Sequence, residues 1–135
     1  MTPIFCIGET IEDRNSGNTF KVLENQIRKA YQDIDKNDLS KIVIAYEPVW
    51  AIGTGVSATT EQASEAHTWI RNFLNENYGK ESSNIRILYG GSMNEKNSFD
   101  LLSCPDIDGG LIGGAALKLE SFISILNNAE TTYKN

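Results

Sequence analysis

The sequence predicts an α/β fold in which four strands of one parallel sheet alternate with four helices. Short apolar runs at residues 4–7, 42–46, 85–89 and 108–112 have the length and composition of strands. Apolar residues recur at helical spacing after each run. Strands that alternate with helices form parallel sheets with right-handed crossovers. No linker or second compositional block is visible, so one domain is expected over residues 1–135.

The first two strand–helix units carry the clearest patterns. The first strand ends at Gly8, and the apolar residues of the helix that follows are spaced three to four apart. They are Phe20, Leu23, Ile27, Ala30 and Ile34. The second helix opens at Thr59 and Gln62, which have the spacing of a capping box. Its expected buried stripe consists of Ala63, Ala66, Ile70, Phe73 and Leu74.

The last two units are shorter. A brief helix carrying Phe99, Leu101 and Leu102 is expected after the third strand. The fourth strand precedes a helix predicted over about residues 119–127. The polar residues 130–135 are expected to fray.

Composition excludes several classes of function. The net charge of −6 provides no basic surface for nucleic acid. No apolar run approaches the roughly 18 residues of a membrane span, and no signal peptide is visible. Two cysteines, Cys6 and Cys104, are too few for a disulfide framework. We therefore expect reduced thiols in a cytoplasmic protein.

A carboxylate and a glycine-containing loop follow the second strand. Glu47 stands at the strand's carboxyl end, where barrel enzymes place their catalytic groups. Pro48 restricts the backbone beyond it, while Gly53 and Gly55 widen the conformations open to the loop. The loop is therefore expected to be a mobile lid whose backbone N–H groups meet an anion. The competing interpretation is that Glu47 only pairs with a cation at the sheet's rim.

Further glycines and a serine follow the third and fourth strands. Ser92 comes after the third strand, and Gly113 and Gly114 come after the fourth. Glycines let a backbone approach a ligand closely, and free N–H groups at the start of a helical turn suit a phosphate. Alternatively, such glycines only permit close packing, an interpretation that applies most to Gly109 and Gly110.

These motifs together resemble the triosephosphate isomerase family. The residues in question are the run 45–55 (AYEPVWAIGTG), Tyr89–Ser92 and Gly109–Gly114. The resemblance covers nearly the whole chain but only the family's second half, strands five to eight. It implies a (β/α)4 half of a TIM barrel, since a full (β/α)8 barrel takes about 250 residues.

The resemblance implies a role for each matching position. Glu47 corresponds to the general base that interconverts dihydroxyacetone phosphate and glyceraldehyde 3-phosphate in glycolysis and gluconeogenesis, without cofactor or metal. Gly53, Ser92, Gly113 and Gly114 correspond to the phosphate site. The residues that correspond to the hinges and latch of the family's lid are Pro48, Trp50, Gly55, Ser57, Ala58 and Tyr89. Ala116 replaces the family's usual serine, so one side-chain contact is expected to be lost.

Other positions are expected to be structural. The resemblance implies an ion pair between Arg71 and Asp108 and a rim or packing role for Glu9. His67, the single histidine, lies within a predicted helix and far from any strand end. We expect it to lie on the surface or in helix packing.

The matched half lacks two catalytic groups of the family. They are the lysine after strand one and the histidine after strand four of the full barrel, which have no counterpart in this chain. The loss of one electrostatic donor of this kind lowers the rate about 10²–10³-fold. The isolated chain is therefore expected to bind triose phosphate, phosphate or sulfate and to turn over little. Open sheet edges also predict a homodimer or a missing N-terminal half as partner, although a homodimer would not restore the lost pair.

Three functions consequently compete. The chain is a fragment active only with an N-terminal partner, a non-catalytic phosphate-binding or structural half-barrel that self-associates, or a member of another phosphate-handling barrel family.

Overall fold

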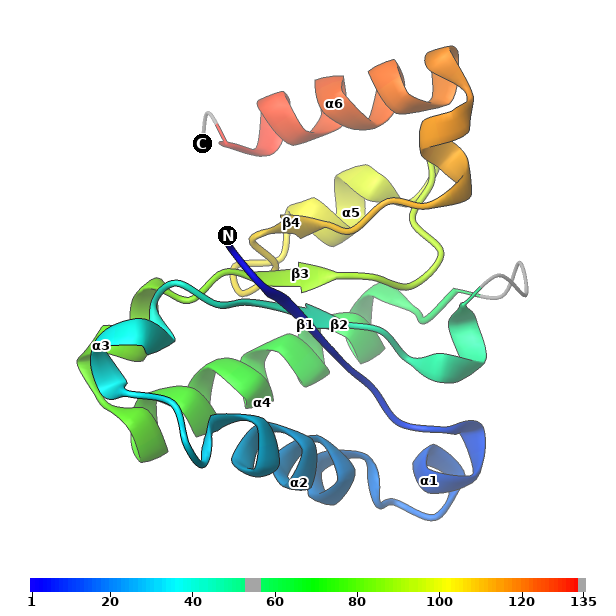
Figure 1. The fold of residues 1–135 in the computed structure, drawn as a ribbon. Coiled ribbons are helices and arrows are strands. Elements are labelled where there is room, and N and C mark those ends of the chain that lie inside the picture. The colour runs from blue at the N-terminus through cyan, green and yellow to red at the C-terminus, as the bar shows by residue number, and fades with distance from the viewer. Residues whose placement is uncertain (53–56, 134–135) are drawn as a thin grey trace.

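Four parallel strands form a single sheet in the computed structural model, which describes residues 1–52 and 57–133 (Figure 1). The strands are β1 (Ile4–Ile7), β2 (Val43–Tyr46), β3 (Ile87–Tyr89) and β4 (Gly109–Gly110), and they pair in the order β1-β2-β3-β4. Ile7 pairs with Tyr46, which pairs in turn with Tyr89. The carboxyl ends of the strands therefore lie at one edge. The predicted α/β class and parallel order are confirmed.

Helices connect the strands and cover one face of the sheet. The first connection holds α1 (Ile11–Asn15), α2 (Thr19–Tyr31) and α3 (Lys36–Leu39). The second holds the 3-10 turn η1 (Val49–Ala51), helix α4 (Thr60–Tyr78) and the turn η2 (Lys80–Asn84). Helix α5 (Ser98–Leu102) precedes β4, while η3 (Gly114–Leu117) and α6 (Leu119–Tyr133) follow it. In Figure 1, α2 and α4 run along one face, and α6 lies against α5 beyond β4.

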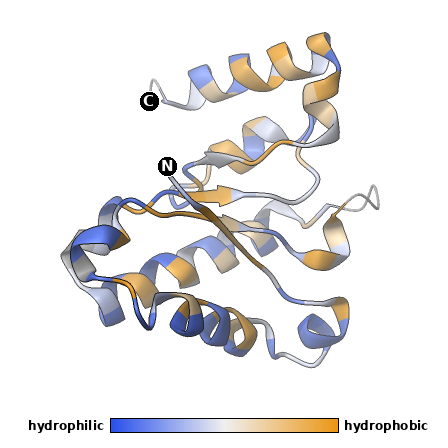
Figure 2. Ribbon diagram, in the orientation of Figure 1, coloured by the Kyte–Doolittle hydropathy of each residue, from blue (hydrophilic) through white to orange (hydrophobic). Residues whose placement is uncertain are grey.

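The core lies between the sheet and helices α2 and α4. Leu23 and Ile27 of α2 and Ile70 of α4 are fully buried, as is Ile44 of β2. The apolar stripe predicted for α4 is buried throughout, and its Thr59–Gln62 capping box is present. Figure 2 shows hydrophobic residues along the strands and on the inner sides of these helices. Helical periodicity in the sequence thus identified the core correctly.

An ion pair joins α4 to the base of β3 and β4, as predicted. Arg71 Nη2 lies 2.5 Å from Asp108 Oδ2, and the same oxygen accepts a hydrogen bond from the Ile87 N–H at 2.7 Å. Arg71 Nη1 also donates to the Ile85 carbonyl oxygen at 2.5 Å. This guanidinium therefore fixes the register of three segments at the amino ends of the strands.

The structure corrects two expectations about the end of the chain. The final helix continues to Tyr133 instead of ending near residue 127, so residues 130–133 do not fray. The Tyr133 hydroxyl donates to the Asp108 carbonyl oxygen, and the Thr131 hydroxyl donates to the Asn127 carbonyl at 2.9 Å. These bonds hold the last turn, and composition alone gave no sign of them.

The sheet and α6 leave apolar side chains exposed on the side away from α2 and α4. Ile4 of β1 is exposed although Ile7 of the same strand is buried. On α6, Leu119, Ile123 and Leu126 follow one another at helical spacing and are all exposed. These three residues, called the α6 stripe below, are an apolar helix face that nothing in the described chain covers.

Candidate active site

Glu47 leaves β2 at the carboxyl edge of the sheet and lies directly above Gly90. Its N–H donates to the Ile7 carbonyl oxygen at 2.7 Å, which extends the ladder one residue past β2. A Cβ placed on Gly90 would stand 2.4 Å from Glu47 Cγ, so only glycine leaves room for this side chain. Gly8 is more tightly constrained, because a Cβ there would lie 1.7 Å from the backbone carbonyl oxygen of Glu47. Two neighbouring strands thus hold the carboxylate in place.

The thiol of Cys6 on β1 is a neighbour of the Glu47 carboxylate. Burial, the negative charge of Glu47 and a hydrogen bond to its side chain all raise the pKa of Cys6. The thiol consequently stays protonated at neutral pH and can donate a hydrogen bond to the carboxylate.

A second carboxylate, Glu9, is fully buried and organises the segment after Glu47. It accepts hydrogen bonds from Arg14 Nη1 at 2.9 Å, the Tyr46 hydroxyl at 3.1 Å and Trp50 Nε1 at 3.2 Å. Burial and the charge of Glu9 raise the pKa of Tyr46, which keeps the phenol a donor. Glu9 thereby ties the indole of η1, in the predicted first hinge, to β1 and β2. The packing role expected for Glu9 agrees with these contacts.

The residues predicted as lid and latch are described only in part. Pro48 and Trp50 stand before the loop, Ser57 and Ala58 come after it, and Gly53 and Gly55 lie outside the described residues. Ser92 Oγ donates to the Ala51 carbonyl oxygen at 2.8 Å, so the loop after β3 is bonded to the end of η1.

Tyr89, the other predicted latch residue, points its phenol back over the following turn. A Cβ on Gly91 would lie 2.3 Å from its hydroxyl oxygen. Burial raises the pKa of Tyr89, and the nearby Ala58 backbone opposes that rise. No described residue makes a hydrogen bond of good geometry with this hydroxyl.

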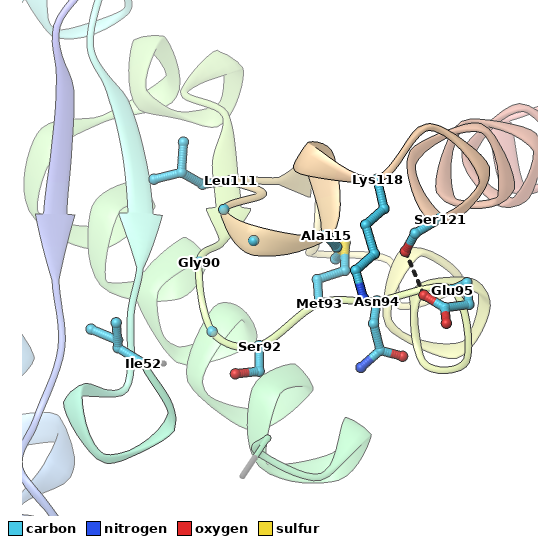
Figure 3. A pocket seen from close by; sticks show the side chains of 13 residues that line it. Ile52, Gly90, Ser92, Met93, Asn94, Glu95, Leu111, Ala115, Lys118 and Ser121 are labelled. Atoms are coloured by element: carbon cyan, nitrogen blue, oxygen red, sulfur yellow. Dashed lines mark hydrogen bonds between the residues drawn. The ribbon is translucent and has the colours of Figure 1, made fainter. Parts of the chain in front are cut away.

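A cavity of about 550 Å³ opens at the carboxyl ends of β3 and β4 (Figure 3). We call it the glycine cavity. It is lined by Ile52, Gly90, Gly91, Ser92, Met93, Asn94, Glu95, Leu111, Gly113, Gly114, Ala115, Lys118 and Ser121. Three of the four residues predicted to bind phosphate therefore share one cavity, and Gly90 connects it to the Glu47 side chain.

The four glycines at and after β4 differ in what surrounds them. A Cβ on Gly109 would lie 3.1 Å from Leu88 Cδ2, and one on Gly110 would lie 2.6 Å from Met93 Sδ. Those two glycines permit close packing, as the structural interpretation held. At Gly113 and Gly114 a Cβ would meet nothing within 4 Å. Packing among the described residues therefore does not require glycine at these two positions.

Backbone donors border the glycine cavity. Among the described residues, none accepts a hydrogen bond from the N–H of Ser92, Gly113 or Gly114. Unused backbone donors in one concavity are the arrangement that binds anions such as phosphate. The sequence predicted these three positions, but it missed Glu95 and Lys118, because no motif marks a side chain that reaches a cavity from a neighbouring loop.

His67 is also buried, so of the two positions expected for it, on the surface or in helix packing, the surface position was wrong. It is fully buried beneath the sheet, where its ring meets the rings of Tyr46 and Tyr89 at 5.7 and 6.4 Å. Its Nδ1 lies 3.2 Å from the Asp106 carbonyl oxygen. Burial lowers its pKa from 6.5 to about 4, so the ring is neutral at neutral pH. The alternative expectation, a role in helix packing, agrees with these contacts.

Within residues 1–52 and 57–133, no three potential metal ligands gather into one group. The same part of the chain contains no helix long and apolar enough to span a membrane. The expectation of no cofactor remains a prediction.

The fold and the site together define a class of protein. A parallel (β/α)4 sheet with a carboxylate and free backbone donors at the carboxyl ends of its strands is half of a TIM barrel. The sequence profile of the family described as triosephosphate isomerase matches residues 1–129. The chain belongs to the triosephosphate isomerase family. This finding contradicts the hypothesis of another phosphate-handling barrel family.

Curated relatives give the same result and show how much of the family is present. The triosephosphate isomerase of Fusobacterium nucleatum is 54% identical over 127 residues, which is 93% of this chain and 51% of that protein. The one from Chloroherpeton thalassium is 52% identical over 128 residues, 94% of this chain and 51% of that protein. The chain therefore spans about half the length of the curated relatives it matches.

Proposed function

We propose that this chain is the base-carrying, phosphate-holding half of a triosephosphate isomerase. It would interconvert dihydroxyacetone phosphate and glyceraldehyde 3-phosphate, in glycolysis and gluconeogenesis, only together with a chain that supplies the other half. The observation that carries the proposal is the contact between Glu47 and Gly90, which links a carboxylate to a cavity bordered by free backbone donors.

Glu47 is the proposed general base. A carboxylate at this position would take a proton from one substrate carbon and return it to the adjacent carbon, which isomerises the triose without a cofactor. General bases act efficiently when the bound substrate excludes water, because desolvation strengthens a carboxylate as a base. Gly8 and Gly90 limit where Glu47 can lie and therefore aim it.

The glycine cavity is the proposed phosphate site. The N–H groups of Ser92, Gly113 and Gly114 would donate to the phosphate oxygens, with the Gly53 N–H joining when the lid closes. Open space at Gly113 and Gly114 supports this assignment, because a ligand needs that space and none of the residues that the structure describes fills it. The bond from Ser92 to Ala51 supports a latch role for the loop after β3, in which Tyr89 would assist.

The predicted partner is either the missing N-terminal half or a second copy of this chain. The exposed α6 stripe supports association, because a soluble protein gains stability when it covers such a face. Only the N-terminal half would supply the family's lysine and histidine. The isolated chain, or its homodimer, would therefore bind phosphate with negligible turnover, which is the alternative function of a non-catalytic half-barrel. Cytoplasmic localisation likewise remains a proposal.

Phosphate binding and turnover of the isolated chain test this proposal together. We expect inorganic phosphate to shift the amide NMR signals of Ser92, Gly113 and Gly114, and we expect Gly114→Val to abolish the shifts. Ala116→Val is the matched control, because Ala116 is in the same 3-10 turn, is exposed, and does not line the cavity. Signals that do not respond to phosphate in the wild type would refute the phosphate site.

Turnover is measured beside Glu47→Ala prepared identically, which exposes any contaminating host isomerase. Equal, near-zero rates are expected from the two proteins. A rate that depends on Glu47 in the isolated chain would show that the lysine and histidine are dispensable.

A further inference from the structure

We propose that Lys118 is the cationic ligand of the glycine cavity and binds the phosphate that the backbone donors hold. This inference rests on the phosphate site proposed above and adds a side chain to it. No sequence motif or expected family role pointed to Lys118. Its place in the cavity wall is what identifies it.

Among the described residues that line the glycine cavity, Lys118 is the one cation. It stands between η3 and α6, and its backbone is fixed on both sides. Its N–H donates to the Ala115 carbonyl oxygen at 3.4 Å, and its carbonyl accepts from the Phe122 N–H at 3.0 Å. Figure 3 shows the side chain extending from this junction into the space beside Asn94. The ammonium is thus supplied by the same connection that carries Gly113 and Gly114.

The ammonium is available to a ligand. Among the described residues, none forms an ion pair with Lys118 within 4.0 Å. The nearest opposite charge in the cavity wall is Glu95, whose Oε2 accepts a hydrogen bond from the Ser121 hydroxyl at 2.5 Å. That bond, with the charges of Lys96 and Lys118, lowers the pKa of Glu95. Glu95 is therefore ionised at neutral pH and opposes an anion in the cavity.

The charges of the chain and of the cavity wall favour a cation beside the bound phosphate. The whole chain carries a net charge of −6, so its overall field repels a phosphate dianion. Glu95 adds a local negative charge, and backbone donors carry only partial positive charge. Lys118 is the group in the cavity wall that offsets both effects. Its removal should therefore weaken phosphate binding more than the loss of another nearby lysine.

Lys96 provides the matched control. It is exposed, belongs to the loop after β3, and acts on Glu95 as Lys118 does, but it does not line the cavity. Lys118→Met and Lys96→Met each remove one positive charge, so they change the net charge equally. Lys118→Arg keeps the charge at the cavity and is expected to retain binding.

The experiment is an NMR titration of the full chain with inorganic phosphate at low ionic strength, read at the amides of Gly113 and Gly114. We expect Lys118→Met to raise the dissociation constant about three- to tenfold, the size of one partly solvated charge contact, and Lys96→Met to leave it nearly unchanged. The wild type should also lose affinity with added salt more steeply than Lys118→Met does.

Each outcome decides the inference. Equal dissociation constants for Lys118→Met and Lys96→Met, with phosphate still bound at Gly113 and Gly114, would overturn the role of Lys118 and leave the phosphate site intact. A wild type that binds no phosphate at these amides would overturn both proposals. Thermal unfolding without phosphate checks that each variant is folded.

Discussion

At the scale of single residues, the site depends on Glu47 and the glycine beneath it. The place of Glu47 at a strand end indicated the carboxylate, the glycines after the fourth strand indicated Gly113 and Gly114, and the family resemblance implied Ser92. It did not predict that Gly90 supports Glu47, because that contact depends on the register between β2 and β3. The sequence pattern does not give the register between two neighbouring strands, and this register decides which of their residues meet.

Gly90→Ala tests this contact. The new methyl group would overlap Glu47 Cγ, which would displace the carboxylate while leaving the backbone acceptable, because Gly90 does not have a positive φ. In a complex reconstituted with an N-terminal half, we expect the turnover number to fall about 10²-fold, as displacements near 1 Å do. The free energy of unfolding of Gly90→Ala should change far less. An unchanged turnover number would mean that Glu47 is not held by this contact.

His67 makes a prediction about pH. Its pKa is lowered from 6.5 to about 4 in the folded state, so the unfolded chain binds more protons between these values. The stability that His67 confers as a neutral ring is therefore complete above about pH 6.5 and declines as pH falls toward 4, by about 3 kcal/mol in total. Carboxylates also titrate in this range, so the difference between the wild type and His67→Phe is the quantity to follow.

Because the chain has one histidine, its imidazole resonance reports this pKa directly by proton NMR. A folded-state pKa of 6 or higher would contradict the burial of His67. The helical spacing already indicated this burial, because His67 lies four residues after Ala63 and three before Ile70, on the apolar stripe predicted for α4.

At the scale of elements, the caps and apolar stripes of the helices were visible in the sequence, while the ends of several elements were not. The helix α4 begins at the capping box that Thr59 and Gln62 predict, because that motif satisfies backbone donors within four residues. Helix α6 extends past its predicted end because Tyr133 bonds to Asp108, which is distant in sequence. The local capping signal was therefore predictable from the pattern, while this tertiary contact was not.

Thr59→Ala tests the contribution of the α4 cap. The hydroxyl accepts a hydrogen bond from the Gln62 N–H at 3.2 Å, and its loss should lower the free energy of unfolding by about 1 kcal/mol. Asn18→Ala is the control, because Asn18 precedes α2 without a side-chain capping bond and should change stability little. Chemical denaturation measures both, and equal losses would show that the Thr59 cap contributes nothing particular.

At the scale of the whole molecule, the chain exposes more surface than its mass predicts. Its accessible surface is 7923 Å², against roughly 7,000 Å² for a folded monomer of 14.9 kDa. The excess of about 900 Å² is close to the share that one partner buries in a standard interface, about 800 Å². The α6 stripe accounts for part of it, and we expect a partner to cover this side.

Sedimentation equilibrium tests this expectation. Leu119→Lys with Leu126→Lys should weaken self-association of the isolated chain at least tenfold, because the two charges would be buried in the interface. Ile11→Lys is the control, since Ile11 is an exposed apolar residue of α1, remote from α6 in Figure 1. Equal association of all three proteins would show that the α6 stripe is not the contact between copies.

The most direct test of the central claim is reconstitution of isomerase activity. The chain is mixed with the other half of the Fusobacterium nucleatum relative, and turnover is compared for the wild type and Glu47→Gln, which preserves the shape above Gly90. We predict no activity from either half alone, activity from the wild-type mixture, and none from the Glu47→Gln mixture. A wild-type mixture that forms a complex but stays inactive, or a Glu47→Gln mixture that is fully active, would contradict the account.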